Sequence, residues 1–406
     1  MARLNASGSS DPVPSVPRFV PIATVGSRKS KDAGGRPAHM EYDEPKFFHV
    51  MQYANVADGD VIDMVSGNPD WEPPEALREA LEAYARFPPE EFQYPPSEGL
   101  LELREAIAER RGVGVDRVVI TNGTGEANYL AMARAFERDA GSEALLMDPV
   151  YPYYPGKTEL LGGTPTLVPT RRDGGLDVEA IRTAASEETA LIVLNTPNNP
   201  TGAVYDIEAV REVVAIAEAV DALVVVDEVY DAFDLSGRFE SALTLDSPNV
   251  IVTSGFSKSM AITGFRVGYA IFPPAHVASA KTRHMLVNVA GARPSQHAVH
   301  AALEATDEAY YAQARDLLDE RIDAFVSALD AAGAEYTRPD GAFYVLARFE
   351  GVPGTMANVK RLIDEAGVAG MPGDTFGTAR RDWFRFALVT PRAAEAAERL
   401  VEYFDG

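Results

Sequence analysis

The chain of 406 residues contains no cysteine, which excludes disulfides, thiolate metal sites, iron–sulfur clusters and cysteine nucleophiles. It also has no long hydrophobic stretch. The longest uninterrupted apolar run covers residues 342–347, far below the ~20 residues that a membrane-spanning helix requires. The beginning of the chain shows no apolar signal core behind basic residues, so we expect a cytoplasmic protein.

Positive charge is scarce as well, with 37 lysines and arginines against 61 aspartates and glutamates and a formal net charge of −24. Only seven of these cations are lysines. Such a balance repels nucleic-acid backbones and anionic membranes, so we expect neither as a partner. Two explanations of the acidic, lysine-poor composition stand side by side: a surface suited to a high-salt cytoplasm, or a GC-rich coding bias.

The chain divides into a tail and a folded part. Residues 1–39 hold glycine, serine and proline clusters without periodicity, which predicts a disordered N-terminal tail. Further along, short apolar runs alternate with helical patterns, the rhythm of a mostly parallel sheet covered on both faces. The predicted strands are residues 117–120, 144–147, 191–194, 223–226, 250–252 and 267–271.

A second, smaller region is predicted from two segments of the sequence, one before and one after the sheet region. Before it, residues 46–51 suggest a short helix and residues 61–65 a strand. After it, a long helical pattern over residues 303–329 leads to two predicted strands, 341–346 and 383–388, and two predicted helices, 359–365 and 392–403.

Polar residues follow several predicted strands, at the ends where open α/β sheets bind their ligands. Residues 121–127, Thr-Asn-Gly-Thr-Gly-Glu-Ala, indicate a glycine turn that opens a helix, whose free N–H groups can hold a phosphate. The turn lacks the Walker lysine and the spaced glycines of dinucleotide folds, so ATP and NAD are disfavoured. Residues 195–202, Asn-Thr-Pro-Asn-Asn-Pro-Thr-Gly, either aim amide side chains at one point or form only a rigid turn.

Two charged residues stand out at the next strand ends. Asp227 directly follows an apolar run, and a buried carboxylate there needs a cationic or protonated partner, which no neighbouring residue in the sequence supplies. Lys258 lies in Ser-Gly-Phe-Ser-Lys, and Arg266 follows eight residues later. In a lysine-poor chain, Lys258 is a candidate for a chemical role, with a solvated surface lysine as the alternative.

Together these strand ends supply what pyridoxal 5′-phosphate (PLP) requires: a phosphate cradle, an acid for the ring nitrogen, donors for the ring oxygen and an amine that can form a Schiff base. The order and spacing of Asn-Pro-Thr-Gly (199–202), Asp-Glu-Val-Tyr (227–230), Ser-Lys (257–258) and Gly-Phe-Arg-Val-Gly (264–268) resemble the class I/II aminotransferases of fold type I, the aspartate aminotransferase superfamily. The resemblance extends from about residue 41 to the C-terminus.

This resemblance implies the PLP-dependent transferase fold type I, an α/β fold. Its large domain holds a mostly parallel mixed sheet flanked by helices, and its smaller domain is α+β. The implied boundaries are residues 40–74 for the N-terminal part of the small domain, 75–295 for the large PLP-binding domain and 296–406 for the C-terminal small domain, with the tail 1–39 outside.

The resemblance also implies roles for single residues. Lys258 would form the aldimine and move a proton between Cα and C4′, and Asp227 would keep the pyridine nitrogen protonated. Asn199 and Tyr230 would donate to the ring oxygen. The other implied contacts are Gly123, Thr124, Gly125, Ser257 and Arg266 at the phosphate, Tyr151 stacked on the ring, Tyr94 lent to the phosphate by a neighbouring subunit, and Gly67 and Arg385, with Asn199, at the substrate carboxylate.

Two positions depart from the family pattern. Gly255 stands where relatives often carry a serine or threonine at the phosphate, which leaves Ser254 and Ser257 as candidate substitutes. Gly125 stands where some aspartate-specific relatives carry a lysine, so a second cation for a side-chain carboxylate is not evident there. Arg293 is either that cation or a structural arginine near a subunit interface.

The implied activity is that of a PLP-dependent aminotransferase and homodimer with shared active sites. It moves an amino group between an L-amino acid, aspartate-like or of broad range, and a 2-oxo acid such as 2-oxoglutarate, by a ping-pong cycle via an aldimine on Lys258. A PLP-dependent lyase or decarboxylase on the same fold is the alternative, because it shares these motifs. A PLP-sensing regulator would need a DNA-binding module that the tail cannot supply. His297 and His300 have no accompanying ligand cluster, so we expect no metal site.

Overall fold

The computed structural model describes residues 46–405. The tail predicted for residues 1–39 lies outside the described residues. Two sheets of unequal size, each packed against its own helices, organise the part of the chain that is described. Within residues 46–405, no helix is both long and apolar enough to span a bilayer.

The larger sheet contains seven strands in the order β2-β8-β7-β6-β5-β3-β4. Only β8 runs antiparallel to its neighbours, so the sheet is mostly parallel, as predicted. The strands are β2 (Val118–Asn122), β3 (Glu143–Asp148), β4 (Thr164–Pro169), β5 (Thr189–Asn195), β6 (Leu223–Asp227), β7 (Val250–Gly255) and β8 (Val267–Ile271). The six predicted apolar runs coincide with six of them. Strand β4 was not predicted, because it is a partly exposed edge strand that contains two prolines.

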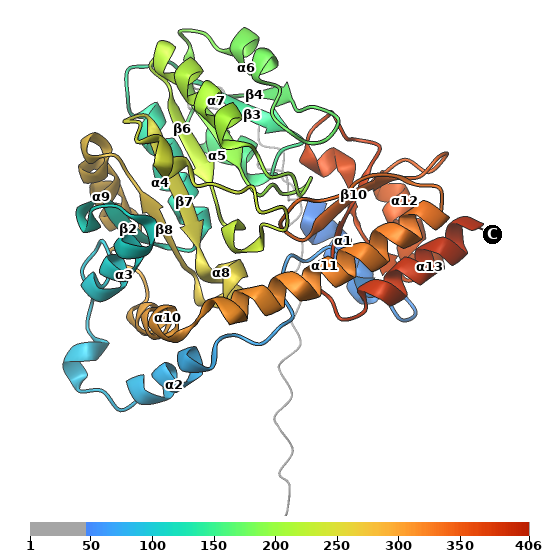
Figure 1. Cartoon of the computed structure of the whole chain (residues 1–406), viewed down its shortest axis with the longest axis horizontal. Coiled ribbons are helices and arrows are strands. Elements are labelled where there is room, and N and C mark those ends of the chain that lie inside the picture. The colour runs from blue at the N-terminus through green and yellow to red at the C-terminus, as the bar shows by residue number, and fades with distance from the viewer. Residues whose placement is uncertain (1–45, 406) are drawn as a thin grey trace, which may run out of the picture. The chain divides into compact units, whose positions relative to one another are not determined.

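Helices cover both faces of this sheet, which explains why its strands are continuous apolar runs. In β6, Val224 and Val226 pack on one face and Leu223 and Val225 on the other. The first face is covered by α6 (Val178–Ala184) and α7 (Ile207–Ala219), and its part near β2 and β8 is covered by α2 (Glu75–Tyr84), α3 (Leu101–Arg111) and α10 (Arg293–Ala305). The second face is covered by α4 (Thr124–Phe136), α5 (Tyr153–Leu160) and α9 (Pro274–Asn288) (Figure 1).

The smaller sheet is antiparallel, with the strand order β12-β13-β10-β9. Its strands are β9 (Glu335–Thr337), β10 (Tyr344–Arg348), β12 (Met371–Pro372) and β13 (Phe384–Ala387), and a separate parallel pair joins β1 (Ile62–Asp63) to β11 (Val368–Ala369). The helices beside it are α1 (Lys46–Val56), α11 (Glu308–Ala331), α12 (Met356–Arg361) and α13 (Ala393–Asp405). The predicted elements at both ends of the chain are therefore present, although β1 is shorter than the predicted strand.

Helix α11 links the two sheet regions, running from beside α10 to the core under α13 (Figure 1). Segments from both ends of the described chain share one core, since Ile62 and Met64 pack with Phe386 and Leu400. This arrangement matches the fold class implied by the resemblance. The residue boundaries given above for the two domains stay predictions.

Candidate active site

The carboxyl ends of three neighbouring parallel strands form the floor of the candidate site. Asp227, the last residue of β6, pairs in register with Asn195 of β5 on one side and Thr253 of β7 on the other. The Asn195 side chain donates to the backbone oxygen of Asp227 and accepts from the backbone N–H of Asn199. Asn199 and Asp227 are thus held together at one sheet edge, as the strand-end argument predicts.

Asp227 is a buried carboxylate supported by neutral donors. Its Oδ2 accepts hydrogen bonds of 2.7 Å from Asn128 Nδ2 and from the Tyr154 hydroxyl, and its Oδ1 accepts one of 3.1 Å from the backbone N–H of Val229. Burial raises the pKa of Asp227, and these donors oppose the rise only in part. A cation placed against this carboxylate would therefore be bound strongly.

Lys258 lies on α8 (Phe256–Ser259), the short helix that follows β7. Its Nζ donates a hydrogen bond of 2.6 Å to the backbone oxygen of Gly67. Burial lowers the pKa of Lys258 to about 8, helped by the positive charges of Arg385 and Arg266 and opposed by Asp227. The amine is therefore neutral in roughly a fifth of molecules near physiological pH, far more than for a solvated lysine, and the neutral form is the one that acts as a nucleophile.

The turn between β2 and α4 forms an anion cradle with Arg266. Gly123 has φ of 75°, and a Cβ there would collide with the Arg266 guanidinium. That guanidinium donates to the backbone oxygens of Asn122 and Thr263, and it is exposed. The hydroxyl of Thr124 is buried and has no hydrogen-bond partner among the described residues. An orphaned hydroxyl, a cation and a helix N-terminus at one place suit a phosphate group.

Close packing around residue 255 explains why glycine stands there. A Cβ on Gly255 would contact Thr124 Oγ1 at 2.6 Å and Gly268 Cα at 3.0 Å. A serine or threonine therefore does not fit without displacing the cradle. Of the two candidate substitutes, Ser254 is directed elsewhere, because its hydroxyl donates to the backbone oxygen of Glu228. Ser257 is buried in the first turn of α8, beside Lys258.

Arg385, on β13 of the smaller sheet, is a buried arginine without an acidic partner in the contacts it makes. Its guanidinium donates to the backbone oxygen of Val65 and, at 3.4 Å, to Asn199 Oδ1. It lies 4.6 Å from the ring centre of Tyr344 and 5.1 Å from that of Phe376. Its Nε is buried without a partner among the described residues. Burial lowers the pKa of Arg385, so an incoming carboxylate relieves an unfavourable charge.

Tyrosines line the space between these groups. The hydroxyls of Tyr230 and Tyr344 lie 3.0 Å apart, which joins the end of β6 to β10. The ring of Tyr151 packs edge to face against those of Tyr153 and Tyr154. A Cβ on Gly67 would collide with the Tyr344 hydroxyl, so only glycine lets the backbone approach Lys258 there.

Two of the candidate residues, Tyr94 and Arg293, are not brought to this site within the chain. Tyr94 is 82% exposed, as expected of a residue that acts in a neighbouring subunit, although the described chain alone does not test that role. Arg293 pairs with Glu91, so it does not supply a free second cation here. A side chain at Gly125 would meet nothing within 4 Å, so this glycine leaves open space beside the cradle. His297, for its part, packs against the rings of Tyr84 and Phe87.

The sequence analysis missed Asn128, Tyr154 and Tyr344. Asn128 follows Thr124 by one helical turn and lies among alanines and leucines, so a buried polar residue on an apolar helix face was its only signal. Its Oδ1 accepts from the hydroxyl of Thr253, which orients the amide toward Asp227. Tyr154 and Tyr344 had no signal that separates them from core tyrosines.

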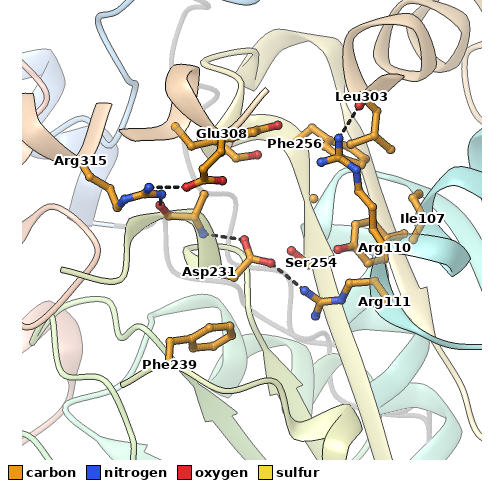
Figure 2. Close-up of a pocket in the computed structure, with 15 residues that line it drawn as sticks. Ile107, Arg110, Arg111, Asp231, Phe239, Ser254, Phe256, Leu303, Glu308 and Arg315 are labelled. Carbon is orange, nitrogen blue, oxygen red and sulfur yellow. Dashed lines mark hydrogen bonds and ion pairs between the residues drawn. The ribbon is translucent and has the colours of Figure 1, made fainter. Parts of the chain in front are cut away.

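A cavity of about 390 Å³ borders α8, and Lys258 is not among the residues that line it (Figure 2). Phe256 and Ser259, three residues apart and so on one face of the helix, line it, together with residues of α3 and α11. Arg111 donates to Asp231 across this cavity, and Arg315 pairs with Glu308. The Arg111–Asp231 ion pair and a hydrogen bond from Arg315 to the backbone oxygen of Ala232 tie down the segment that follows Tyr230.

The comparisons with known proteins agree with this geometry. Residues 59–404 match the family described as aminotransferase class I and II. The chain is 32% identical over 358 residues to a probable aspartate/prephenate aminotransferase of Thermus aquaticus, covering 84% of this chain and 91% of the relative. It is 33% identical over 356 residues to an LL-diaminopimelate aminotransferase of Moorella thermoacetica, covering 84% and 90%. A solved aspartate aminotransferase from Thermus thermophilus with maleate has a TM-score of 0.82 at 29% identity, covering 89% of this chain and 97% of that one.

The chain belongs to the class I and II aminotransferases, a family that generally depends on PLP. The predicted fold type I and the predicted enzyme class, a PLP-dependent aminotransferase, are confirmed, and the lyase alternative is not favoured. The roles of the single residues stay predictions.

Proposed function

We propose that PLP binds in this site, attached to Lys258, and that the two sheet regions hold its two ends and the substrate between them. The observation that carries the proposal is that the charges of Arg385, Arg266 and Asp227 all act on the amine of Lys258. These are a carboxylate clamp, a phosphate cradle and a ring-nitrogen acid around one buried amine. The orphaned Thr124 hydroxyl and the Gly123 turn fit the phosphate group.

When bound, PLP supplies an electron sink for a carbanion at the substrate Cα. Asp227 holds a proton on the ring nitrogen, and Asn128 and Tyr154 keep its carboxylate oriented. Tyr230 and Asn199 would hold the ring oxygen, and Tyr151 would lie against the ring. The amine of Lys258 would move the proton at the substrate Cα. Residues Gly123, Thr124, Gly125, Ser257 and Arg266 hold the phosphate.

Arg385 binds the α-carboxylate of the substrate. Its planar guanidinium presents two parallel N–H donors, which match the two oxygens of a carboxylate. Asn199 and the backbone at Gly67 close around the same group. Val65 and Asn199 satisfy the guanidinium only in part, since Nε has no partner in the described chain.

For the substrates, we propose an aspartate-like or broad range of L-amino acids with 2-oxoglutarate as acceptor. The support is the range of substrates in the names of similar proteins, aspartate and prephenate for one and LL-diaminopimelate for another.

We further propose a homodimer in which each chain lends Tyr94 to the other's phosphate site. Tyr94 is 82% exposed, an unusual fraction for a tyrosine in a folded chain. The end of α9 also exposes a run of apolar side chains, and a contiguous patch of this kind marks an interface. The run consists of Met285, Leu286, Val287 and Val289. From the sequence we also propose a cytoplasmic location.

The test is the near-visible absorbance of the purified protein with PLP, before and after single amino acids are added from a panel. We expect a lysine-bound cofactor band that an amino donor converts to the pyridoxamine band and that a 2-oxo acid restores. The Lys258→Ala variant should show no lysine-bound band. If the wild type forms none either, the proposed site is wrong; release of ammonia or carbon dioxide by the panel would instead point to the lyase.

A further inference from the structure

Asp148, the last residue of β3, is buried and takes its hydrogen bonds from the other sheet region. It lies three residues before Tyr151 and is 2% exposed. The backbone N–H and the hydroxyl of Thr378 donate to its Oδ2 at 3.0 and 2.8 Å, and the N–H of Ala379 donates to the same atom at 3.0 Å. The Thr378 N–H also lies 3.2 Å from Oδ1. A carboxylate fixed by this many donors holds their segment firmly.

Two further hydrogen bonds tie the same segment down. The N–H of Val150 donates to the backbone oxygen of Phe376 at 2.7 Å, and Arg380 donates to the backbone oxygen of Arg172 at 2.7 Å. We call residues 376–380 the latch segment. It is joined to the edge of the larger sheet at its beginning, middle and end.

The backbone of the latch segment is shaped for this contact. Gly377 has φ of 109°, a conformation that residues with a side chain rarely adopt. A Cβ at this position would collide with the Asp148 carboxylate. The close approach of Asp148 therefore depends on glycine at 377.

The two sides of the latch carry different parts of the site. Phe376 is the last residue of η7 (Gly373–Phe376), and its ring packs against Arg385. The ring centre of Phe376 lies 5.1 Å from the guanidinium carbon of Arg385. Asp148 and Val150 precede Tyr151 on the larger sheet. The latch thus fixes the substrate-carboxylate side of the site against the cofactor-ring side.

We propose that Asp148 is a positioning residue that locks residues 376–380 onto the end of β3 and thereby holds Arg385 where it receives the substrate α-carboxylate. This inference rests on the proposed function of Arg385. It assigns to Asp148 an effect on carboxylate affinity, whereas capture of PLP by Lys258 uses none of the latch contacts.

The main test replaces Asp148 by asparagine, which keeps the shape but turns one acceptor oxygen into a donor that faces N–H groups. For PLP-loaded protein we expect KM for the amino donor, and Kd for maleate read from the cofactor absorbance, to rise about tenfold. We expect kcat, PLP affinity and the unfolding temperature to change little.

Matched variants separate positioning from general damage. Thr378→Val removes one hydroxyl donor and should raise the same two constants about threefold, while Thr378→Ser should restore wild-type values. Asp374→Asn is the control in the neighbouring turn, because Asp374 pairs with Lys46 and not with the latch.

The outcomes are distinct. Wild-type KM and maleate affinity in both Asp148→Asn and Thr378→Val overturn the proposal, and so does a parallel loss of PLP affinity, kcat and unfolding temperature, which marks a merely structural role. If Asp148→Asn does not fold, Thr378→Val against Thr378→Ser decides. Failure of the proposed function looks different, because the wild type itself then forms no lysine-bound cofactor band.

Discussion

Two neighbouring carboxylates at the end of β6, Asp227 and Glu228, point to opposite sides of the sheet edge and have different partners. Asp227 is 3% exposed and accepts from neutral donors only, on the side of Lys258. Glu228 is fully buried, forms an ion pair with Arg111, and accepts from the Ser241 hydroxyl and the N–H of Ala242.

The difference separates a structural from a functional charge. Arg111 pairs with Glu228 and also contacts Asp231 at 2.9 Å beside the cavity of Figure 2, so both carboxylates on this side have a cation within the chain. Among residues 46–405, no cation forms an ion pair with Asp227 and no carboxylate forms one with Arg385. A buried charge that the chain itself leaves uncompensated is expected where a ligand brings the opposite charge.

The largest expected effect comes from neutralising Asp227. Asp227→Asn keeps the shape but cannot hold a proton on the ring nitrogen, so kcat should fall about a thousandfold. The free energy of unfolding of the PLP-free protein should change little, because the loss of an uncompensated buried carboxylate offsets the one amide N–H that then faces a hydrogen-bond donor. Steady-state kinetics and urea unfolding measure the two quantities, and a large loss of stability without PLP would contradict this view of Asp227.

The sequence predicted the position of Asp227 better than its hydrogen-bond partners. Lys258, Asp227 and Asn199 follow apolar strands directly, so their gathering at one sheet edge was predictable from parallel-strand geometry. The partners of Asp227 were not, because Asn128 and Tyr154 come from helices 99 and 73 residues away. Sequence reasoning asked for a cationic or protonated partner for Asp227, which the resemblance assigns to the ring nitrogen of PLP, and it did not anticipate the neutral donors that also hold the carboxylate. The latch between Asp148 and Thr378 was equally unpredictable, since it spans 230 residues.

Neutralising Glu228 should have the opposite effect to neutralising Asp227: a loss of stability with little loss of activity. Glu228→Gln leaves Arg111 buried with only Asp231 as an acidic partner, so the free energy of unfolding should fall by about 3 kcal/mol. Activity of the molecules that remain folded should be close to normal. Urea unfolding, with kinetics corrected for the folded fraction, tests both statements, and unchanged stability would show that the ion pair is not structural.

The same contrast applies to the two arginines. Arg385→Gln should raise KM for the amino donor about 30-fold, corresponding to about 2 kcal/mol, because the two-point contact with the α-carboxylate is lost. The unfolding free energy of the PLP-free protein should not fall, whereas Arg111→Gln should lower it. Equal destabilisation by both substitutions would mean that Arg385 is a structural arginine.

Taken per pH unit, the smallest expected effect is a pH dependence that sharpens the comparison at Lys258. Its pKa is lowered to about 8 in the folded PLP-free protein, below its ordinary value of 10.5, so the unfolded chain binds a proton more tightly between these values. The contribution of Lys258 to stability is therefore unfavourable below pH 8 and disappears as the pH rises to about 10.5. Over that window the advantage of Lys258→Met over wild type in unfolding free energy should shrink by about 1 kcal/mol per pH unit, as urea unfolding at a series of pH values would measure. An advantage that stays constant across the window would show that the buried amine carries its proton as easily as a solvated one, and Lys258 would then be no better prepared to act as a nucleophile than a lysine on the surface.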